Sequence, residues 1–412
     1  MNLIKNITLW NSFFYLYCLL PILLISGPFL PDLIISIISL VFLFYIFKNT
    51  NISALFKDKF IIFLLIFYVW INLSSLFSET ILISMKSSFF YIRFIIFIIA
   101  GYILFEKIEN FSQKYFLFIL CGCIILFLDA NIQYIVGKNI LGFESQIRTA
   151  RVSSLFGDEA ILGSYLSKIF PIFLCVYLQI KRKINIYFLS IISFIFFFTI
   201  FIAGERAAIF HSLIFLLVFF TISTFNKKKI IVTIILSIII LSVLSVSIID
   251  KDKNHRVFKS VYYQFKHGYV ISKYHEEHFK SAYIMFKDSP IIGHGVKSFR
   301  NKCKDFKVGK NSCSTHPHNT YLQLLAETGL VGFILIFGFF LYISFLILKC
   351  FYLKYFKSII FLENDKIAIL VGLFTYLFPV SSNGNFFNNW LSILFFLQVS
   401  LFYIKFKNEK FF

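Results

Sequence analysis

Two histidines separated by a proline, His316 and His318, stand directly before one of the most apolar stretches of the chain, in the segment STHPHNTYLQLLAETGLVGF. Thr320 and Gln323 have capping-box spacing, so a helix is expected to begin there. A histidine beside the positive end of a helix tends to be neutral, and a neutral imidazole can accept a proton. His318 could therefore act in acid–base chemistry. A structural role beside the helix end explains the same residues.

A single carboxylate follows on the same expected helix. Glu327 lies roughly 10 Å along that helix from Thr320, at 1.5 Å per residue. A carboxylate within a membrane helix is costly enough to suggest a function. Gly329 and Gly332, which come next, are expected to allow close packing between helices.

An arginine marks a second place of interest. Arg206, in AGERAAI, sits between two apolar runs, in a connection so short that the residue has to lie at a membrane boundary. Its guanidinium group presents a fork of donors that suits phosphate oxygens. An ion pair with Glu205, or anchoring at the interface, explains the same arginine.

The segment 250–319 is strongly basic, with 14 lysines and arginines against six acidic residues. A basic surface beside a membrane suits an anionic ligand such as phosphate or pyrophosphate, although a solvated lysine-rich loop has the same composition. Part of the segment, HEEHFKSAYIMFKD, is expected to form an amphipathic helix. Its apolar face would carry Phe279, Ala282, Tyr283 and Phe286.

Cys303 and Cys313 stand ten residues apart in the same segment. In the oxidising compartment outside a bacterial inner membrane, this spacing predicts a local disulfide. A zinc site that combines the two thiols with His316 and His318 is the alternative. The spacing matches no common zinc pattern, so no metal site is expected.

These residues have to be positioned by membrane helices. Of the 412 residues, 59% are hydrophobic and only 15% are charged, which is more apolar surface than a soluble core could bury. We expect an all-α polytopic membrane protein that forms one domain over residues 1–412. Runs of about 20 apolar residues, the length that crosses the hydrocarbon layer, indicate membrane helices. Twelve are predicted, at 10–26, 29–47, 60–77, 87–105, 115–136, 160–180, 184–203, 207–225, 230–249, 320–348, 366–380 and 386–404.

The basic residues predict the orientation, because short cytoplasmic loops collect them. With both termini in the cytoplasm, 19 of the 40 lysines and arginines fall in inside segments and five in the short outside segments. Segment 250–319 is then a large periplasmic loop and 137–159 a smaller one. Topology and attraction to membrane lipid explain the net charge of +20 without nucleic acid. The expected location is a bacterial inner membrane, with the candidate residues facing the periplasm.

Four segments, in the same order, resemble those of the O-antigen ligase and O-antigen polymerase superfamily. HPHNTYLQLLAETGLVGF resembles the histidine-asparagine pair that leads into a helix with Glu-x-Gly, and SPIIGHGVKSF resembles the proline-to-glycine turn. RVSSLFGDEAILGSYL and GERAAI resemble the two earlier arginine segments. The resemblance covers most of the chain and implies a GT-C-like membrane fold.

The resemblance also implies a reaction: transfer of a glycan from a polyprenyl-pyrophosphate donor, without metal or cofactor. The acceptor is a sugar hydroxyl of lipid A-core in the ligase branch and a lipid-linked glycan in the polymerase branch. A direct in-line attack would invert the anomeric carbon. By position, His318 is the general base and Arg206 binds pyrophosphate. The other residues implied to bind substrate are Arg151, Arg300, Lys280, His316, Asn319 and Glu327.

One departure from the family pattern concerns the diphosphate site. The family often has another arginine before the proline-glycine turn, where this chain has His275, His278 and Lys280. Lys280 or Arg300 is expected to complete the site. O-antigen ligase is the preferred function and polymerase the second.

Two further functions fit the sequence less well. A transporter or flippase would gather polar residues near the membrane midplane. A protein oligosaccharyltransferase would carry an acidic pair in the first outer loop, where only Asp32 stands.

Overall fold

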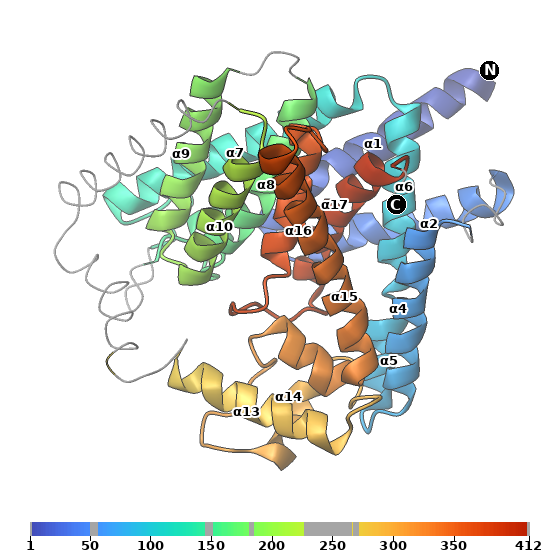
Figure 1. Ribbon diagram of the computed structural model, residues 1–412, viewed down its shortest axis with the longest axis vertical. Helices are drawn as coiled ribbons and strands as arrows, with labels where there is room; N and C mark the ends of the chain where they lie inside the picture. Colours follow the sequence, from blue (N-terminus) through green and yellow to red (C-terminus); the bar gives the residue numbers. More distant parts are fainter. Residues whose placement is uncertain are drawn as a thin grey trace.

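The computed structural model describes residues 2–49, 57–144, 151–180, 185–225, 266 and 272–409, with side chains from residue 10 onward except at residue 49. Over these residues the protein is all-helical and contains no β-sheet. Figure 1 shows a bundle of long helices, with α13 and α14 together at one end and the N-terminus at the other.

The helices, labelled as in Figure 1, occupy most of the described chain. They are α1 (Asn2–Leu23), η1 (Leu24–Ser26), α2 (Phe29–Asn49), α4 (Lys59–Leu76), α5 (Ile81–Phe89), α6 (Ile92–Lys107), α7 (Phe111–Val136), η2 (Ser154–Phe156), α8 (Leu162–Ile180), α9 (Ile186–Ile202), α10 (Arg206–Ile222), α13 (Lys273–Asp288), α14 (Phe299–Lys302), η3 (Cys303–Phe306), α15 (Thr320–Phe356), α16 (Asn364–Tyr376) and α17 (Asn389–Phe406).

Most of the predicted membrane helices coincide with helices of the structure. Seven segments of the described chain are long and apolar enough to cross a membrane, and three shorter apolar helices accompany them. This confirms a multi-pass, all-helical membrane protein. The predicted helix 87–105 needs correction, because the chain turns at Phe90 and Tyr91 and divides into α5 and α6. The predicted helix 230–249 lies outside the described residues.

The centre of the bundle is formed by α8, α16 and α17. In the apolar windows of α8 and α17, 83% of the residues are buried, against 33% in α2. The outer helices therefore turn most of their apolar side chains to the lipid, while the central ones contact protein on all sides. Gly372 of α16 allows the close contact with α8, because a Cβ there would lie 2.4 Å from the Cβ of Pro171.

Polar contacts tie segments together at the end of the bundle opposite α13. The hydroxyl of Tyr403 donates to Asp58 (2.6 Å), and the ammonium of Lys405 donates to Asp365 (2.6 Å). Segments that the basic-residue pattern assigns to the cytoplasm thus lie at a common end of the molecule. The loops that carry the candidate residues gather at the other end (Figure 1).

The helix α15 is kinked near its beginning. Gly329 has φ 66° and ψ −169°, outside the helical region, so Thr320–Thr328 forms a short first part. The predicted helix 320–348 is therefore wrong as one unbroken element. A Cβ at Gly329 would lie 2.0 Å from the carbonyl oxygen of Ile291, so only glycine fits against this turn. The close contact at this glycine is with the turn at Ile291 and Ile292, and not with another helix as predicted.

The predicted amphipathic helix is α13, but its buried face differs from the prediction. Tyr283 is 47% exposed. The buried residues are His278, Ser281, Ala282 and Met285. Small and polar side chains predominate on this face because α13 packs closely on the first part of α15 and on η3.

Candidate active site

The loop that carries the two histidines ends at the cap of α15. The side-chain oxygen of Asn319 accepts hydrogen bonds from the backbone N–H groups of Tyr321 (3.0 Å) and Leu322 (3.1 Å). The helix begins at Thr320 as predicted, but the expected capping box is wrong. Asn319 is the N-cap, and it satisfies two donors that a helix start leaves unpaired.

The same loop is fastened to the connection between α16 and α17. The amide nitrogen of Asn319 donates to the carbonyl of Pro379 (2.8 Å), and the carbonyl of His318 accepts from the backbone N–H of Asn383 (2.9 Å). His318 has φ 59°, a left-handed conformation that is uncommon outside glycine. These contacts, at the carbonyl of His318 and at the side chain of the next residue, hold it in that conformation.

Three other imidazole rings surround that of His318. The ring of His316 lies 4.1 Å from it, and the rings of His275 and His278, both on α13, lie at 5.0 and 5.3 Å, measured between ring centroids. All four histidines stand out in the sequence as candidate or neighbouring residues of the site. The structure brings them together because α13 packs against the start of α15.

All four histidines have lowered pKa values. Burial lowers the pKa of His318 to about 3, and the surrounding imidazoles add to the effect. Burial likewise lowers the pKa of His316 to about 4. The pKa values of His275 and His278 are also lowered, again mainly by burial. The rings are therefore neutral at physiological pH, as expected for His318, although burial rather than the helix end is the main cause.

Hydrogen bonding distinguishes the two histidines of the loop. The Nδ1 atom of His316 lies 3.0 Å from the hydroxyl of Thr315, and its Nε2 atom is buried without a hydrogen-bond partner among the described residues. Neither ring nitrogen of His318 makes a hydrogen bond within the described chain. His318 is thus the less constrained proton acceptor of the two.

A cavity of about 710 Å³ opens beside these histidines. Its wall combines basic groups, amides and apolar side chains from segments far apart in the sequence. A wall of this composition suits a ligand that carries negative charge, sugar hydroxyls and an apolar part. Lining residues include Lys168, His211, Lys297, Arg300 and His316, then Asn383, Asn385 and Asn388, then Ile25, Phe156, Trp390 and Leu391.

The predicted substrate-binding residues fall at different places relative to this cavity. Arg300 and His316 line it, and the ring of His318 adjoins that of His316. Lys280 is exposed on α13 and is not among the lining residues, so Arg300 is the better placed of the two cations offered for the diphosphate site.

Arg206 is the first residue of α10. Its charge adds a minor contribution to the lowering of the pKa of His275, which burial mainly causes. The carboxylate of the preceding residue, Glu205, caps α8 by accepting from the N–H of Gly163 (2.7 Å). The stem of Arg151 reaches the same turn, because a Cβ at Gly204 would lie 3.5 Å from its Cγ.

Glu327 is fully buried, and both of its carboxylate oxygens are occupied by groups of the chain itself. Oε2 accepts from the N–H of Lys297 (3.0 Å) and from Gln323 (2.9 Å), and Oε1 accepts from the N–H of Phe299 (3.2 Å). Its backbone carbonyl accepts from the N–H of Gly295 (2.8 Å). Glu327 therefore holds the turn SPIIGHGVKSF against α15.

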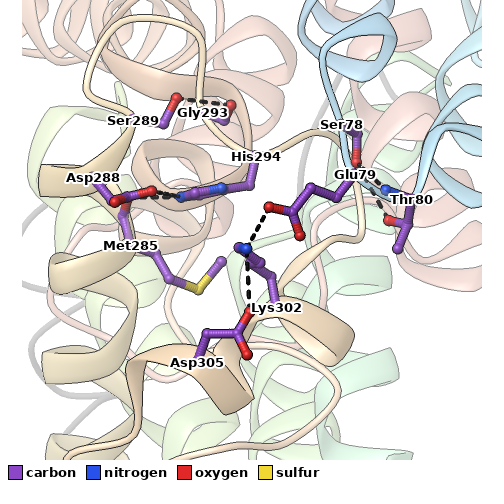
Figure 2. Close-up of polar contacts among 10 residues, drawn as sticks. All are labelled: Ser78, Glu79, Thr80, Met285, Asp288, Ser289, Gly293, His294, Lys302 and Asp305. Atoms are coloured by element: carbon purple, nitrogen blue, oxygen red, sulfur yellow. Dashed lines mark hydrogen bonds and ion pairs between the residues drawn. The ribbon is translucent and has the colours of Figure 1, made fainter.

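The outer side of the same turn contacts the tip between α4 and α5. Figure 2 shows the Lys302 ammonium between Glu79 (2.5 Å) and Asp305 (3.2 Å). It also shows His294, whose Nε2 donates to the carbonyl of Met285 (3.0 Å). Exposed ion pairs of this kind contribute little stability, about 0–1 kcal/mol each. The ion pairs nevertheless determine that α14 and η3 contact the tip between α4 and α5.

Cys303 and Cys313 are joined by a disulfide, with their Cα atoms 5.7 Å apart. The bond closes the hairpin between η3 and the histidine loop. Neither thiol is then available to the zinc site considered as an alternative. Among the described residues, no group of histidine, cysteine and acidic side chains is arranged to hold a metal ion.

Sequence reasoning missed several residues of the cavity wall. Lys297 lies within the proline-to-glycine turn, three residues before Arg300, and Lys168 and His211 lie inside apolar helices. A charge such as Lys168 within an apolar helix suggests a buried partner and a role in assembly, not a place in a binding site. The run SSNGNFFNN, before the last helix, supplies the lining amides. Its density of asparagine at an expected outer helix end was the signal that could have indicated a sugar-binding wall.

Comparison with known families agrees with this geometry. Residues 191–337 match the family model described as O-Antigen ligase. No curated protein matches the sequence. The matched residues contain Arg206, the imidazole cluster, Lys297 and Glu327, which together form much of the site. Residues 191–337, which make up less than half of the chain, are thus similar to the O-antigen ligase family, and they lie in a multi-pass membrane protein.

Proposed function

We propose that the protein is an O-antigen ligase that transfers a glycan from polyprenyl pyrophosphate to a sugar hydroxyl of lipid A-core. The observation that carries the proposal is the position of His318, whose pKa is lowered by burial and whose side chain makes no hydrogen bond within the described chain. Its ring lies next to that of His316, which lines the cavity together with Lys297, Arg300 and several side-chain amides.

The reaction needs two kinds of group. A glycosyl diphosphate already carries a good leaving group, so cations have to neutralise the charge that develops on the pyrophosphate, and a base has to deprotonate the acceptor. Arg206 and Arg300 are proposed to neutralise the charge on the pyrophosphate. Arg151 is a third guanidinium near the same turn.

His318 is proposed as the base that deprotonates the acceptor hydroxyl. As the acceptor oxygen bonds to the anomeric carbon, the bond from that carbon to the phosphate oxygen breaks, and the hydroxyl proton passes to the imidazole. The products are the glycosylated acceptor and polyprenyl pyrophosphate, with inversion at the anomeric carbon. His316, which lines the cavity, would orient the acceptor, and Asn319 and Glu327 would act by positioning the loop and the turn.

The proposed topology follows from the basic-residue pattern. Twelve membrane helices, with both termini in the cytoplasm, would place 250–319 and 137–159 in the periplasm of a bacterial inner membrane. The diphosphate head group of a polyprenyl lipid lies at the membrane boundary, which is why the base and the cations would gather at this end.

A deletion strain tests the function. Lipopolysaccharide is separated on a gel, and lipid-linked glycan is extracted from the same cells. We expect loss of attached glycan together with accumulation of full-length lipid-linked polymer, restored by the intact gene. Core that carries a single repeat would identify a polymerase, and unchanged lipopolysaccharide would reject both.

A further inference from the structure

Lys297 is a half-buried cation in the cavity wall. It has φ 60°, a left-handed conformation that costs a non-glycine residue roughly 1 kcal/mol. Its ammonium group makes no hydrogen bond or ion pair within the described chain. A partly buried charge of this kind is stabilised when an anion binds beside it.

Other cations of the protein do form ion pairs or hydrogen bonds with groups of the chain. Arg93 binds Asp32 at 2.6 Å, Lys302 binds Glu79 at 2.5 Å, and Lys168 donates to the carbonyl of Ser164 at 3.3 Å. These three already have partners in the protein. Lys297 feels the charges of Glu327 and Asp32 but forms no hydrogen bond or ion pair with either, and it faces the same cavity as Arg300, three residues further on.

Backbone contacts hold Lys297 in place. Its N–H donates to the carboxylate of Glu327 (3.0 Å), and the N–H of Phe299 donates to the other oxygen of that carboxylate (3.2 Å). Glu327 is fully buried and belongs to the first part of α15. The side chain of Lys297 is thus presented to the cavity from a rigid turn.

We propose that Lys297 binds the pyrophosphate of the lipid-linked donor together with Arg300, and that Glu327 is the positioning residue that presents it. The proposal rests on the function proposed above and adds Lys297 to Arg206 and Arg300 as a cation that meets the leaving group. Two cations on one wall match the two phosphates. Charge held in place before reaction stabilises the departing diphosphate without reorganisation.

The first experiment measures binding without transfer. Purified protein in detergent is titrated with farnesyl pyrophosphate and, separately, with farnesol, and binding is followed by thermal stabilisation. For Lys297→Gln we expect the Kd for farnesyl pyrophosphate to rise about tenfold, the effect of losing one charge-assisted hydrogen bond. The response to farnesol should not change. Lys304→Gln, an exposed lysine of η3, is the matched control and should bind like the parent.

The second experiment tests the part of Glu327. Glu327→Gln alone should weaken the binding of farnesyl pyrophosphate. In protein that already carries Lys297→Gln, the same change should cause little further loss of binding, because the carboxylate acts through the lysine. A purely structural role would weaken both backgrounds and the farnesol response equally.

The outcomes separate this proposal from the proposed function. If Lys297→Gln binds farnesyl pyrophosphate like the parent while the parent transfers glycan, Lys297 is not the phosphate ligand and the ligase function stands. If the parent neither binds the diphosphate nor transfers glycan, the function itself fails. Equal weakening by Lys304→Gln would show that only the general charge of the loop matters, and would overturn the assignment.

Discussion

At the scale of single residues, the two histidines of the loop have different surroundings although one proline separates them. His316 lines the cavity and has Thr315 beside its Nδ1. His318 is enclosed by imidazoles and is anchored through its backbone carbonyl to Asn383. A base needs a nitrogen that can accept a proton, and an orienting residue needs contact with the substrate, so the two positions suit different tasks.

Replacement of His318 by alanine should abolish most of the transfer. General-base contributions are typically about 10²- to 10⁴-fold, so we expect a loss of that size for His318→Ala and a smaller loss for His316→Ala. Both variants would be purified in detergent, checked for monodispersity and assayed with lipid-linked glycan and acceptor. If His318→Ala retains nearly the parent rate, or only His316→Ala is inactive, the assignment of the base is wrong.

The imidazole cluster should make stability depend on pH. The pKa values of His318 and His316, about 3 and about 4, lie below the ordinary value of 6.5. As the pH falls below 6.5, the unfolded chain therefore binds protons that the folded protein excludes, and the folded state loses stability. Melting temperatures in detergent should be flat from pH 8 to 7 and fall toward pH 5. A variant with both residues changed to glutamine should show a smaller fall, and an equal fall would contradict this account.

At the scale of elements, the site depends on one contact between a helix and a turn. The turn SPIIGHGVKSF packs against α15 where Gly329 interrupts the helix, and a Cβ at Gly293 would lie 2.5 Å from the backbone there. The sequence predicted the turn, the helix and the importance of Glu327 separately. The contact between the turn and the helix could not be predicted from the sequence. A 3.6-residue pattern shows which face of a helix is apolar, but it does not show where a positive φ angle bends the helix axis.

Gly329→Ala should destabilise the protein. The positive φ angle and the contact with Ile291 together should cost about 2–5 kcal/mol, seen as a lower melting temperature and reduced transfer. Gly338 offers a control in the same helix, because a Cβ there meets nothing within 4 Å. Gly338→Ala should change stability by no more than about 1 kcal/mol. Equal melting temperatures for the two variants would show that the kink is not constrained as described.

The disulfide stabilises the element that precedes the histidine loop. Closing a loop of this length contributes about 3 kcal/mol in the chain-entropy description, so Cys303→Ser combined with Cys313→Ser should lower the melting temperature and the transfer rate. Mass-tagging of free thiols in oxidised membranes provides the direct measurement. Labelling of both cysteines before reduction would show that the bond is absent from the native protein.

At the scale of the whole molecule, composition and charge predicted much of the architecture. Most apolar runs coincide with helices of the described chain, although 87–105 is divided into two helices and 320–348 is kinked and continues to Phe356. The basic-residue pattern grouped segments that the structure does bring to a common end, as Lys405 and Asp365 illustrate. The cavity could not be predicted in the same way. Its wall joins Lys168, Lys297 and Asn385 from three separate parts of the chain, and no local pattern records that meeting.

The proposed orientation can be tested by labelling. In a background without the five free cysteines, Lys304→Cys should react with a membrane-impermeant maleimide in intact spheroplasts. Lys357→Cys, an exposed position at the other end of α15, should react only after lysis. The reverse pattern would place the site in the cytoplasm and exclude lipopolysaccharide as the acceptor.

The histidine loop is fastened to residues 379–386, through Asn319 to Pro379, His318 to Asn383 and Gln323 to Asn385. These anchors lie outside 191–337, the residues that match the family. The domain is therefore not a transplantable module. A chimera that grafts 191–337 onto another scaffold would carry His318 without the residues that anchor its loop. Grafts meant to change glycan specificity would have to exchange the connection between the last two helices as well.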